Sequence, residues 1–404
     1  MQVGVTRELR AGERRVAATP ETVTQLVALG LDVVVEKGAG VESGYSDAAY
    51  KDAGATIAAT LPLGKLDVLV HVRPLSPATV KSLKKGAVTV GLASPSTELP
   101  TVAALAAGNI TSFALELIPR ISRAQSMDAL SSQALVGGYR AVIEAVSRYP
   151  RFFPLYMTAA GTIPPAKVLV LGAGVAGLQA IGTAKRLGAR VSANDIRAAS
   201  ADEVRSMGGT FINLDLDTAA EGTGGYAKEL AEDRAQRQRD LLAPHIAAAD
   251  VLITTAAIPG RAAHLLVTTE MVKGMRDGSV IIDMAAESGG NVEGVVAGED
   301  TPIAVEGGTV TLVGLQDAPS AVPSDASRLY AKNVSNLLAL MTKEGVVAPD
   351  YTDEVVAGAC LTRDGNVTHE PTANTLAEKK APAKKAPVKK AAAPKAPTTK
   401  KGAK

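Results

Sequence analysis

The chain has 404 residues, of which 46% are hydrophobic and 3% aromatic, with one cysteine, no tryptophan and a net charge of +2. This length suits two ordinary domains, the aliphatic composition is typical of α/β sheets, and the single Cys360 excludes an intrachain disulfide. The first residues show no signal peptide, and no apolar run reaches the ~20 residues of a membrane span, so we expect a soluble chain.

The near-neutral charge conceals two different regions. Residues 378–404 contain ten lysines, four prolines and one glutamate, whereas 1–377 contain 33 basic and 40 acidic residues. A segment without aliphatic periodicity cannot build a core, so we expect a disordered Lys/Ala/Pro-rich tail. Contact with nucleic acid or acidic lipid is one interpretation of such a tail. A solubilising or tethering extension is the favoured interpretation, and no nucleic-acid partner is expected.

In the first third of the chain, short apolar runs alternate with helical patterns, which predicts a parallel sheet. The predicted strands are Val3–Val5, Asp32–Val35, Asp67–Val72, Ala87–Leu92 and Thr111–Leu115. The predicted helices are Pro20–Leu29, with Thr19 as its cap, Asp47–Ala53 and Leu99–Ala107. A long helix, Gln125–Tyr149, is predicted next, and four prolines follow it before the next unit.

Polar residues are concentrated at the start of that long helix, in the sequence RISRAQSMDALSSQ (120–133). Gln125, Asp128 and Ser131 recur every three residues, which on a helix gives a slowly winding polar strip. The alternative is that Ser122 and Asp128 cap and solvate the beginning of the helix. Capping explains two of the polar residues, so a binding role is favoured for the stretch.

The sequence AKVLVLGAGVAGLQAIGTAKRLGARVSANDIR (166–197) is a dinucleotide-binding fingerprint in its expected setting. After the strand Lys167–Leu171, Gly172 allows a tight turn, Gly174 allows a pyrophosphate to approach the backbone, and Gly177 allows close helix packing. The following helix N-terminus favours phosphate. Asp195 ends the second strand, where it would bind ribose hydroxyls and repel a 2′-phosphate, so NAD(H) is favoured over NADP(H) despite Arg197 nearby.

Further strands are predicted at Asp250–Thr255, Ser279–Met284 and Thr309–Leu315, and a helix near Asp325–Lys343. The glycine-rich, polar segment Glu221–Arg239 is interpreted as a mobile flap that carries Tyr226, with an exposed surface loop as the alternative. The four histidines lack metal-ligand spacing, so structural roles are favoured and no metal is expected.

Six motifs together resemble the alanine dehydrogenase/nicotinamide nucleotide transhydrogenase family over about residues 1–370. They are GERRVAATP, VEKGAGVESGYSDAAY, IPRISRAQSMDALSSQ, GAGVAGLQAIGTAKRLGA, GGYAKE and VIIDMAAESGGN. RAQSMD and GGYAKE are specific to the NAD(H)-binding component of the proton-translocating transhydrogenase branch. The resemblance implies hydride transfer of the Si-Re (AB) type from NADH to NADP⁺, which a partner subunit binds, coupled to proton translocation.

The resemblance also assigns roles to individual positions. At the nicotinamide end it implies contacts from Arg120, Ile121, Ser122, Gln125, Asp128 and Ser131, of which Arg120, Gln125, Asp128 and Ser131 form the candidate catalytic group. It assigns the pyrophosphate to Val175, Ala176 and Gly177, the adenosine end to Asp195, Ile196 and Arg197, further contacts to Gly225, Gln238 and Ala257, and flap closure to Tyr226.

Alanine dehydrogenase is the alternative within the family, because amine oxidation requires a protein acid or base. The resemblance places that enzyme's active-site histidine at Gly91, its substrate lysine at Arg73 and its late aspartate at Glu287, whereas Arg15 is retained. Hydride transfer between two nicotinamides needs orientation and no protein base, which fits these departures. A non-catalytic NAD-binding scaffold ranks third, since it has no use for the polar stretch at 120–133.

We therefore expect two Rossmann-like α/β domains, one of them dinucleotide-binding. The first is formed by residues 1–131 and 325–377, the second by 132–324, and 378–404 form the tail. By resemblance, the chain is a homodimer that binds NAD(H) and docks on the cytoplasmic face of a membrane assembly. A membrane subunit and an NADP(H)-binding beta subunit would be its partners.

Overall fold

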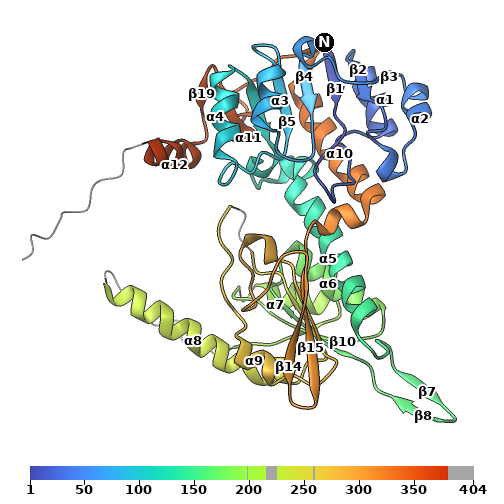
Figure 1. Ribbon diagram of the computed structural model, residues 1–404, viewed down its shortest axis with the longest axis vertical. Coiled ribbons are helices and arrows are strands. Elements are labelled where there is room, and N and C mark those ends of the chain that lie inside the picture. The colour runs from blue at the N-terminus through green and yellow to red at the C-terminus, as the bar shows by residue number, and fades with distance from the viewer. Residues whose placement is uncertain (198, 215–224, 258–259, 381–404) are drawn as a thin grey trace, which may run out of the picture.

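The chain forms two parallel-dominated β-sheets with helices on their faces, one above the other in Figure 1. The computed structural model describes residues 1–197, 199–214, 225–257 and 260–380, with the backbone alone for 225–232 and 380. The predicted α/β class with two Rossmann-like sheets is confirmed. The expected tail from 381 onward lies outside the described residues.

The first sheet has eight strands in the order β19-β18-β6-β5-β4-β1-β2-β3. The strands from β6 to β3 are parallel, whereas β18 and β19 are antiparallel at one edge. Strands from both ends of the chain therefore share one sheet, while the domain boundaries at 131 and 325 stay a prediction. The bounds are β1 (Gln2–Val5), β2 (Asp32–Glu36), β3 (Thr56–Ala58), β4 (Val68–Val70), β5 (Val88–Gly91), β6 (Thr111–Ala114), β18 (Cys360–Arg363) and β19 (Asn366–Val367).

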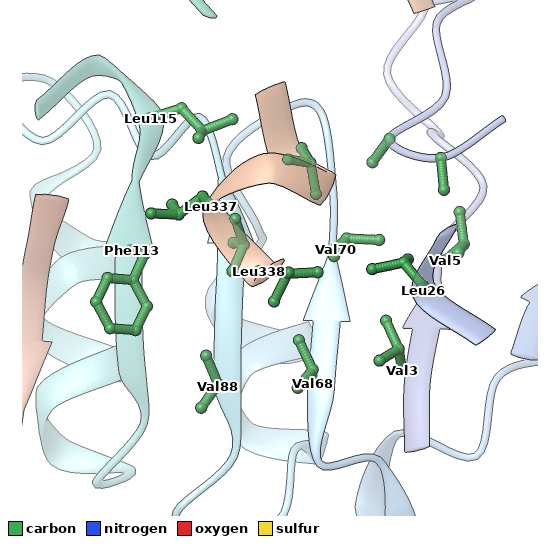
Figure 2. Close-up of a cluster of buried hydrophobic side chains, with 14 of the residues drawn as sticks. Val3, Val5, Leu26, Val68, Val70, Val88, Phe113, Leu115, Leu337 and Leu338 are labelled. Atoms are coloured by element: carbon green, nitrogen blue, oxygen red, sulfur yellow. The ribbon is translucent and has the colours of Figure 1, made fainter. Parts of the chain in front are cut away.

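The first sheet is held by an aliphatic core between its strands and the helices that cover it. Figure 2 shows Val3 and Val5 of β1 beside Val68 and Val70 of β4, with Leu337 and Leu338 packed against them. The helices of this unit are α1 (Pro20–Ala28), α2 (Asp47–Asp52), α3 (Pro77–Ser82), α4 (Leu99–Ala107), α11 (Glu354–Ala359) and α12 (Glu370–Lys380). The predicted cap of α1 is present, since the Thr19 side chain accepts a hydrogen bond from Thr22 N–H.

The second sheet has seven strands in the order β11-β10-β9-β12-β13-β15-β14, all parallel except the edge strand β14. Its central strands are buried on both faces, which explains their continuous aliphatic sequences. The bounds are β9 (Lys167–Leu171), β10 (Arg190–Asn194), β11 (Thr210–Phe211), β12 (Val251–Thr254), β13 (Val280–Asp283), β14 (Asp300–Val305) and β15 (Gly308–Gly314). Its helices are α6 (Val175–Arg186), α7 (Ser200–Ser206), α8 (Gly225–Ala247) and α9 (Thr269–Lys273).

Two long helices, α5 (Ala129–Arg148) and α10 (Pro323–Met341), run between the two units (Figure 1). On α10, the fully buried Tyr330 hydroxyl donates to the carbonyl of His71 at 2.9 Å and accepts from Leu92 N–H at 3.1 Å. The α5 backbone packs so closely on α6 that a Cβ at Gly138 would lie 2.1 Å from the Ala176 oxygen. These contacts attach both sheets to one helical connection.

The remaining elements are short. The antiparallel hairpin β7 (Tyr156–Thr158) and β8 (Gly161–Ile163) projects from the second unit at the lower right of Figure 1, and all six of its residues are exposed. A small ribbon joins β16 (Thr342–Lys343) to β17 (Val346–Val347). The 3-10 helices are η1 (Val41–Ser43), η2 (Leu63–Lys65), η3 (Leu115–Leu117), η4 (Ser122–Met127), η5 (Ala286–Ser288) and η6 (Ala318–Ala321).

Three expectations differ from the structure. The predicted helix Gln125–Tyr149 begins at Ala129, because residues 122–127 form a 3-10 helix and Asp128 caps the helix. The predicted tail begins too early, since helix α12 extends through residues 378–380. In the predicted flap Glu221–Arg239, residues 221–224 lie outside the described residues and the rest belongs to helix α8. Among the described residues no helix is long and apolar enough to cross a membrane.

Candidate functional site: a glycine turn facing a second sheet

The loop after β9 has the backbone that a phosphate-binding turn requires. Gly172 has a φ of +99°, and a Cβ at Gly177 would lie 1.9 Å from the Gly172 oxygen, so both positions require glycine. No atom lies within 4 Å of a Cβ built at Gly174, which is the exposed N-cap of α6. The conformations predicted for this turn are therefore present, with open space at its middle glycine.

The first turn of α6 leaves its amide groups available. The first bond to the cap runs from Leu178 N–H to the Gly174 oxygen at 2.8 Å. Nothing in the described part of the chain accepts from the N–H groups of Val175, Ala176 and Gly177. Unpaired amides together with the positive end of the helix dipole form a site that favours an anionic group.

Asp195 follows β10 directly and lies beside this turn. Its carboxylate accepts hydrogen bonds from Ala173 N–H at 2.7 Å and from Arg197 N–H at 2.8 Å. The Arg197 guanidinium also donates to it at 3.0 Å and to the Ala173 carbonyl at 3.2 Å. Burial raises the pKa of Asp195, but the hydrogen bonds from Arg197 and Ala173 outweigh it, so the pKa is lowered and the group is anionic.

Asn291 organises the neighbouring loops, and sequence reasoning missed it. Its side-chain amide donates to the carbonyls of Ala256 and His264 at 2.9 Å, and its oxygen accepts from Ala256 N–H. The fully buried Asp283 carboxylate in turn accepts from Asn291 N–H and Val292 N–H. The loops after β12 and β13 are thereby fixed beside the glycine turn. The motif VIIDMAAESGGN ends at this asparagine, so its presence in the motif was the available signal.

The polar stretch at 120–127 is tied to α10 and α11 through its backbone and one arginine. The Ser126 carbonyl accepts from Asn333 and Asn336 at 2.9 and 3.0 Å. Arg123 forms a two-bond pair with Asp353, the cap of α11. The side chains of Arg120, Ser122 and Gln125 are exposed, and within the described residues no hydrogen bond or ion pair engages them. A fixed backbone thus presents unpaired polar side chains.

The predicted polar strip of Gln125, Asp128 and Ser131 is wrong in its helical form. Gln125 lies in η4, and Asp128 is the cap of α5, where its carboxylate accepts from the Ser131 N–H at 2.9 Å and the Ser131 hydroxyl at 2.5 Å. Capping therefore accounts for Asp128 and Ser131. Asn333, which the sequence did not indicate, is the residue that ties this turn to α10.

A buried charge cluster lies where the two units meet. The Arg15 guanidinium is 3% exposed and donates two bonds to Glu13 and one to Gln133, at 2.7–2.8 Å. Arg73 pairs with Glu13 and with Asp317. Burial would raise the pKa of Glu13, but the bonds and charge of Arg15, then Arg73 and Ser320, lower it to about 2.

The pairs from Arg73 to Asp317 and from Glu13 to Ser320 join the loops after β1 and β4 of the first sheet to the loop after β15 of the second. These loops also line a cavity of about 270 Å³. The carboxyl ends of the strands in both sheets therefore face one another, which is where ligands bind in open α/β folds.

The position of Gly91 is sterically closed. A Cβ there would lie 2.4 Å from the His71 oxygen and 2.5 Å from its Nδ1. His71 itself is 3% exposed and donates its Nδ1–H to the Arg73 carbonyl at 2.7 Å. Burial lowers the pKa of this imidazole to about 4, so the ring is neutral near pH 7.

Helix α5 connects the polar stretch to the glycine turn. Its cap Asp128 lies ten residues before Gly138, the residue that packs on Ala176 of the turn. At 1.5 Å per residue this is a distance of roughly 15 Å. The structure therefore brings the predicted residues of the turn together and holds the polar stretch about one extended dinucleotide away along the same helix.

The remaining predicted residues are less well defined. Ile196 is 81% exposed and Ala257 is exposed beside the loop after β12. Gln238 lies half-buried on α8, and Gly225 begins that helix. For Tyr226 the structure gives the backbone position in α8 alone. Among the described residues no group of three or more histidine, cysteine or acidic side chains could hold a metal ion.

A parallel sheet with this glycine turn, an acid after its second strand and a second α/β unit opposite defines an oxidoreductase-type NAD-binding protein. Family models named "Alanine dehydrogenase/PNT" match residues 4–137 with the N-terminal domain and 141–370 with the C-terminal domain. The chain belongs to the alanine dehydrogenase/PNT family.

Three relatives illustrate the similarity. The first of two parts of NAD(P) transhydrogenase subunit alpha from Rhodospirillum rubrum is 48% identical over 380 residues, which are 91% of this chain and 98% of the relative. The crystal structure of transhydrogenase from Sinorhizobium meliloti superimposes with a TM-score of 0.80 at 42% identity, over 92% of this chain and 100% of that one. Alanine dehydrogenase of Bacillus subtilis is 30% identical over 390 residues, 95% of this chain and 97% of the relative.

Proposed function

We propose that this chain is the NAD(H)-binding component of a proton-translocating transhydrogenase. Its partner subunits would bind NADP(H) and carry the proton path across the membrane. The relative from Rhodospirillum rubrum, named as a separate portion of a transhydrogenase subunit alpha, supports this assignment because this chain matches nearly its whole length. On this proposal the chain works at the cytoplasmic face of the membrane through those partners.

The residues of the glycine turn fit a dinucleotide. The unpaired amides of Val175, Ala176 and Gly177 would hold the pyrophosphate, and the space at Gly174 leaves room for it. Asp195 would accept bonds from ribose hydroxyls, which supports NAD(H) over NADP(H). Further contacts are proposed from Ile196, Arg197, Gly225, Gln238 and Ala257, with Tyr226 of α8 closing over the nucleotide.

At the other end, the exposed side chains of Arg120, Ser122 and Gln125, with Ile121, would orient the nicotinamide. When bound, that ring supplies the hydride. Asp128 and Ser131 would then act by holding the turn that presents Gln125, since their side chains bond each other. Transfer to a second nicotinamide requires close approach of the two rings and no proton exchange with the protein.

The choice between this function and alanine oxidation depends mainly on Arg15. Its guanidinium is saturated by Glu13 and Gln133 and buried, so no donor remains for a substrate carboxylate. Gly91 cannot be replaced by a base without displacing His71. Both observations support hydride transfer between nucleotides, for which neither group is needed.

The experiment is stopped-flow hydride transfer from NADH with a transhydrogenase NADP(H)-binding component as acceptor. Gln125→Asn keeps the amide but withdraws it by one methylene, and such misplacement costs up to ~10²-fold in the transfer rate. NADH affinity should change far less, because its main contacts lie at the turn. Gln25→Asn on α1, whose amide contacts α10, is the matched control and should transfer at the wild-type rate.

An alanine assay completes the test. Wild-type protein should reduce no NAD⁺ with L-alanine over a pH range of 7–10, conditions under which amine oxidation is favourable. Measurable alanine oxidation would support the alternative enzyme. An unaltered transfer rate in Gln125→Asn would remove Gln125 from the site.

We also propose a homodimer, on the basis of an exposed apolar surface. On α5, Leu135, Tyr139 and Val146 share one helix face and are 37–42% exposed. The chain continues from α5 into Phe152, Leu155 and the hairpin residues Tyr156, Met157 and Ile163, all of them exposed. These eight residues are called the hairpin surface below. An isolated two-stranded hairpin is marginal in water, so a second copy that covers it would stabilise it.

A further inference from the structure

A second cavity lies at the opposite edge of the second sheet from the glycine turn. It has a volume of about 300 Å³ and begins where β9 and β10 begin. Its lining includes both faces of that corner and the end of α8, with the residues Lys167, Leu169, Arg190, Ser192, Thr210, His245, Ala248 and Ala249 among them. Nothing in the proposed function uses this cavity.

The strand register explains why its polar groups converge. Lys167 is the direct neighbour of Arg190, and Ser192 of Thr210, in parallel pairs. Val168 and Val191 point into the core on the other face, so Lys167, Arg190 and Ser192 share the face toward α8. Leu242 and Ile246 of α8 cover that face only near β9, and His245 lies beside the uncovered part.

The cations in the cavity have no acidic partner. No carboxylate in the described residues lies within 4 Å of the charged groups of Lys167, Arg190 or His245. Asp250, the nearest acid in the same row, accepts from the Lys167 backbone N–H at 2.8 Å and lies 3.7 Å from the Arg276 guanidinium. Two adjacent cations on neighbouring strands repel each other, so the empty arrangement is unfavourable.

We propose that this cavity binds a phosphate or pyrophosphate group of a small molecule. Lys167 and Arg190 would supply charge-assisted hydrogen bonds, and the hydroxyls of Ser192 and Thr210 would approach from the side. A tetrahedral oxyanion accepts from several directions at once, which suits donors on three strands and a helix. This site is independent of the nucleotide site, since the two lie at opposite ends of β9.

The test is calorimetric titration of the full chain with inorganic pyrophosphate, in buffer saturated with NADH and at constant ionic strength set with chloride. A saturable one-site isotherm is expected. Arg190→Gln and Lys167→Gln should each weaken binding at least ~10-fold, because each removes a charge-assisted bond of about 1.5–3 kcal/mol. Arg186→Gln, an exposed cation of the same unit outside the cavity, should bind within twofold of wild type.

Two further arms decide the interpretation. Citrate carries similar charge without a phosphate, so citrate binding as tight as pyrophosphate would overturn the assignment of ligand class. The site itself would be overturned by an unsaturable isotherm, or by equal loss in Arg190→Gln and Arg186→Gln. Thermal midpoints of all variants verify folding. If NADH fails to bind, the proposed nucleotide site fails, whereas the variant pattern still locates the pyrophosphate.

Discussion

At the scale of single residues, the balance between Asp195 and Arg197 decides nucleotide choice. The carboxylate is held by Ala173 N–H and paired to the guanidinium, so ribose hydroxyls must share acceptors that are already in use. The side chain of Arg197 is 58% exposed and can swing away, whereas that of Asp195 is 8% exposed and cannot. The fixed charge at this position is therefore negative.

We expect wild-type protein to bind NADH at least ~10-fold tighter than NADPH, because an uncompensated charge clash costs more than ~1.4 kcal/mol. Asp195→Asn should narrow this ratio, since it removes the negative charge and frees Arg197 for a 2′-phosphate. Titration calorimetry measures both affinities. Asp202→Asn, whose carboxylate pairs with Arg205 on the exposed face of α7, is the control and should keep the wild-type ratio. Equal affinities in the wild type would disprove the role of Asp195.

Glu8 gives a prediction for the pH dependence of stability. Burial raises its pKa to about 7 from the ordinary 4.5, despite bonds from Val72 and Arg73 N–H. The folded state then holds the proton more tightly, so this contribution is full below pH 4.5 and is lost as pH rises through 7. Glu8→Gln should remove a loss of about 1–3 kcal/mol between pH 5 and 7.5. Urea unfolding at both values measures it, and the exposed Glu306→Gln should keep the wild-type slope.

The sequence predicted those residues whose role follows from local backbone rules. Gly172 and Gly177 have the conformation that their spacing indicated, and Asp195 lies beside the turn. Asn291 and Asn333 could not be predicted, because each acts by joining segments that are distant in the chain. The saturation of Arg15 by Gln133, 118 residues away, was hidden for the same reason.

At the scale of elements, α5 carries the connection between the two sheets, and two adjacent glycines on it differ in what they face. A Cβ at Gly138 would lie 2.1 Å from the Ala176 backbone oxygen, which cannot move without displacing α6. A Cβ at Gly137 would meet the terminal methyl of Met284 at 3.0 Å, and this flexible side chain can yield. The same substitution should therefore have opposite consequences one residue apart.

Gly138→Ala should lower the free energy of unfolding by about 1–3 kcal/mol, since overpacking outweighs the ~1 kcal/mol that alanine gains over glycine in a helix. It should also weaken NADH binding, because Ala176 belongs to the first turn of α6. Gly137→Ala, the matched control, should be neutral or slightly stabilising. Urea unfolding and NADH titration on both variants test this. Equal stability of the two would show that α5 and α6 can separate freely.

The elements that sequence patterns failed to predict are those without local signals. Strands β18 and β19 are stabilised by pairing with β6, about 250 residues earlier, so their short sequences carry little periodicity. Edge strand β14 and hairpin β7–β8 alternate weakly because their residues are largely exposed. The start of α5 was placed too early because the 3-10 turn before it has the same spacing of apolar residues as a helix.

At the scale of the whole molecule, the loops at the carboxyl ends of both sheets meet through buried ion pairs, whereas the hairpin surface faces away uncovered. The pairs of Arg73 with Glu13 and Asp317 are polar contacts between units, of the kind found where domains within a chain touch. The hairpin surface is apolar and continuous with α5, of the kind found where copies of a chain associate. One molecule thus separates its polar internal junction from its apolar external one.

We expect the full chain to be a dimer at micromolar concentration and the hairpin surface to form the contact. Replacing Tyr156 and Met157 together by serine should raise the dimer dissociation constant at least ~10-fold, because central apolar residues contribute most of the binding energy at such interfaces. Sedimentation equilibrium measures this. Val346→Ser removes a similarly exposed apolar side chain from the β16–β17 ribbon and should leave the dimer intact. A monomeric wild type would refute the dimer, and an undiminished association in the double variant would place the contact elsewhere.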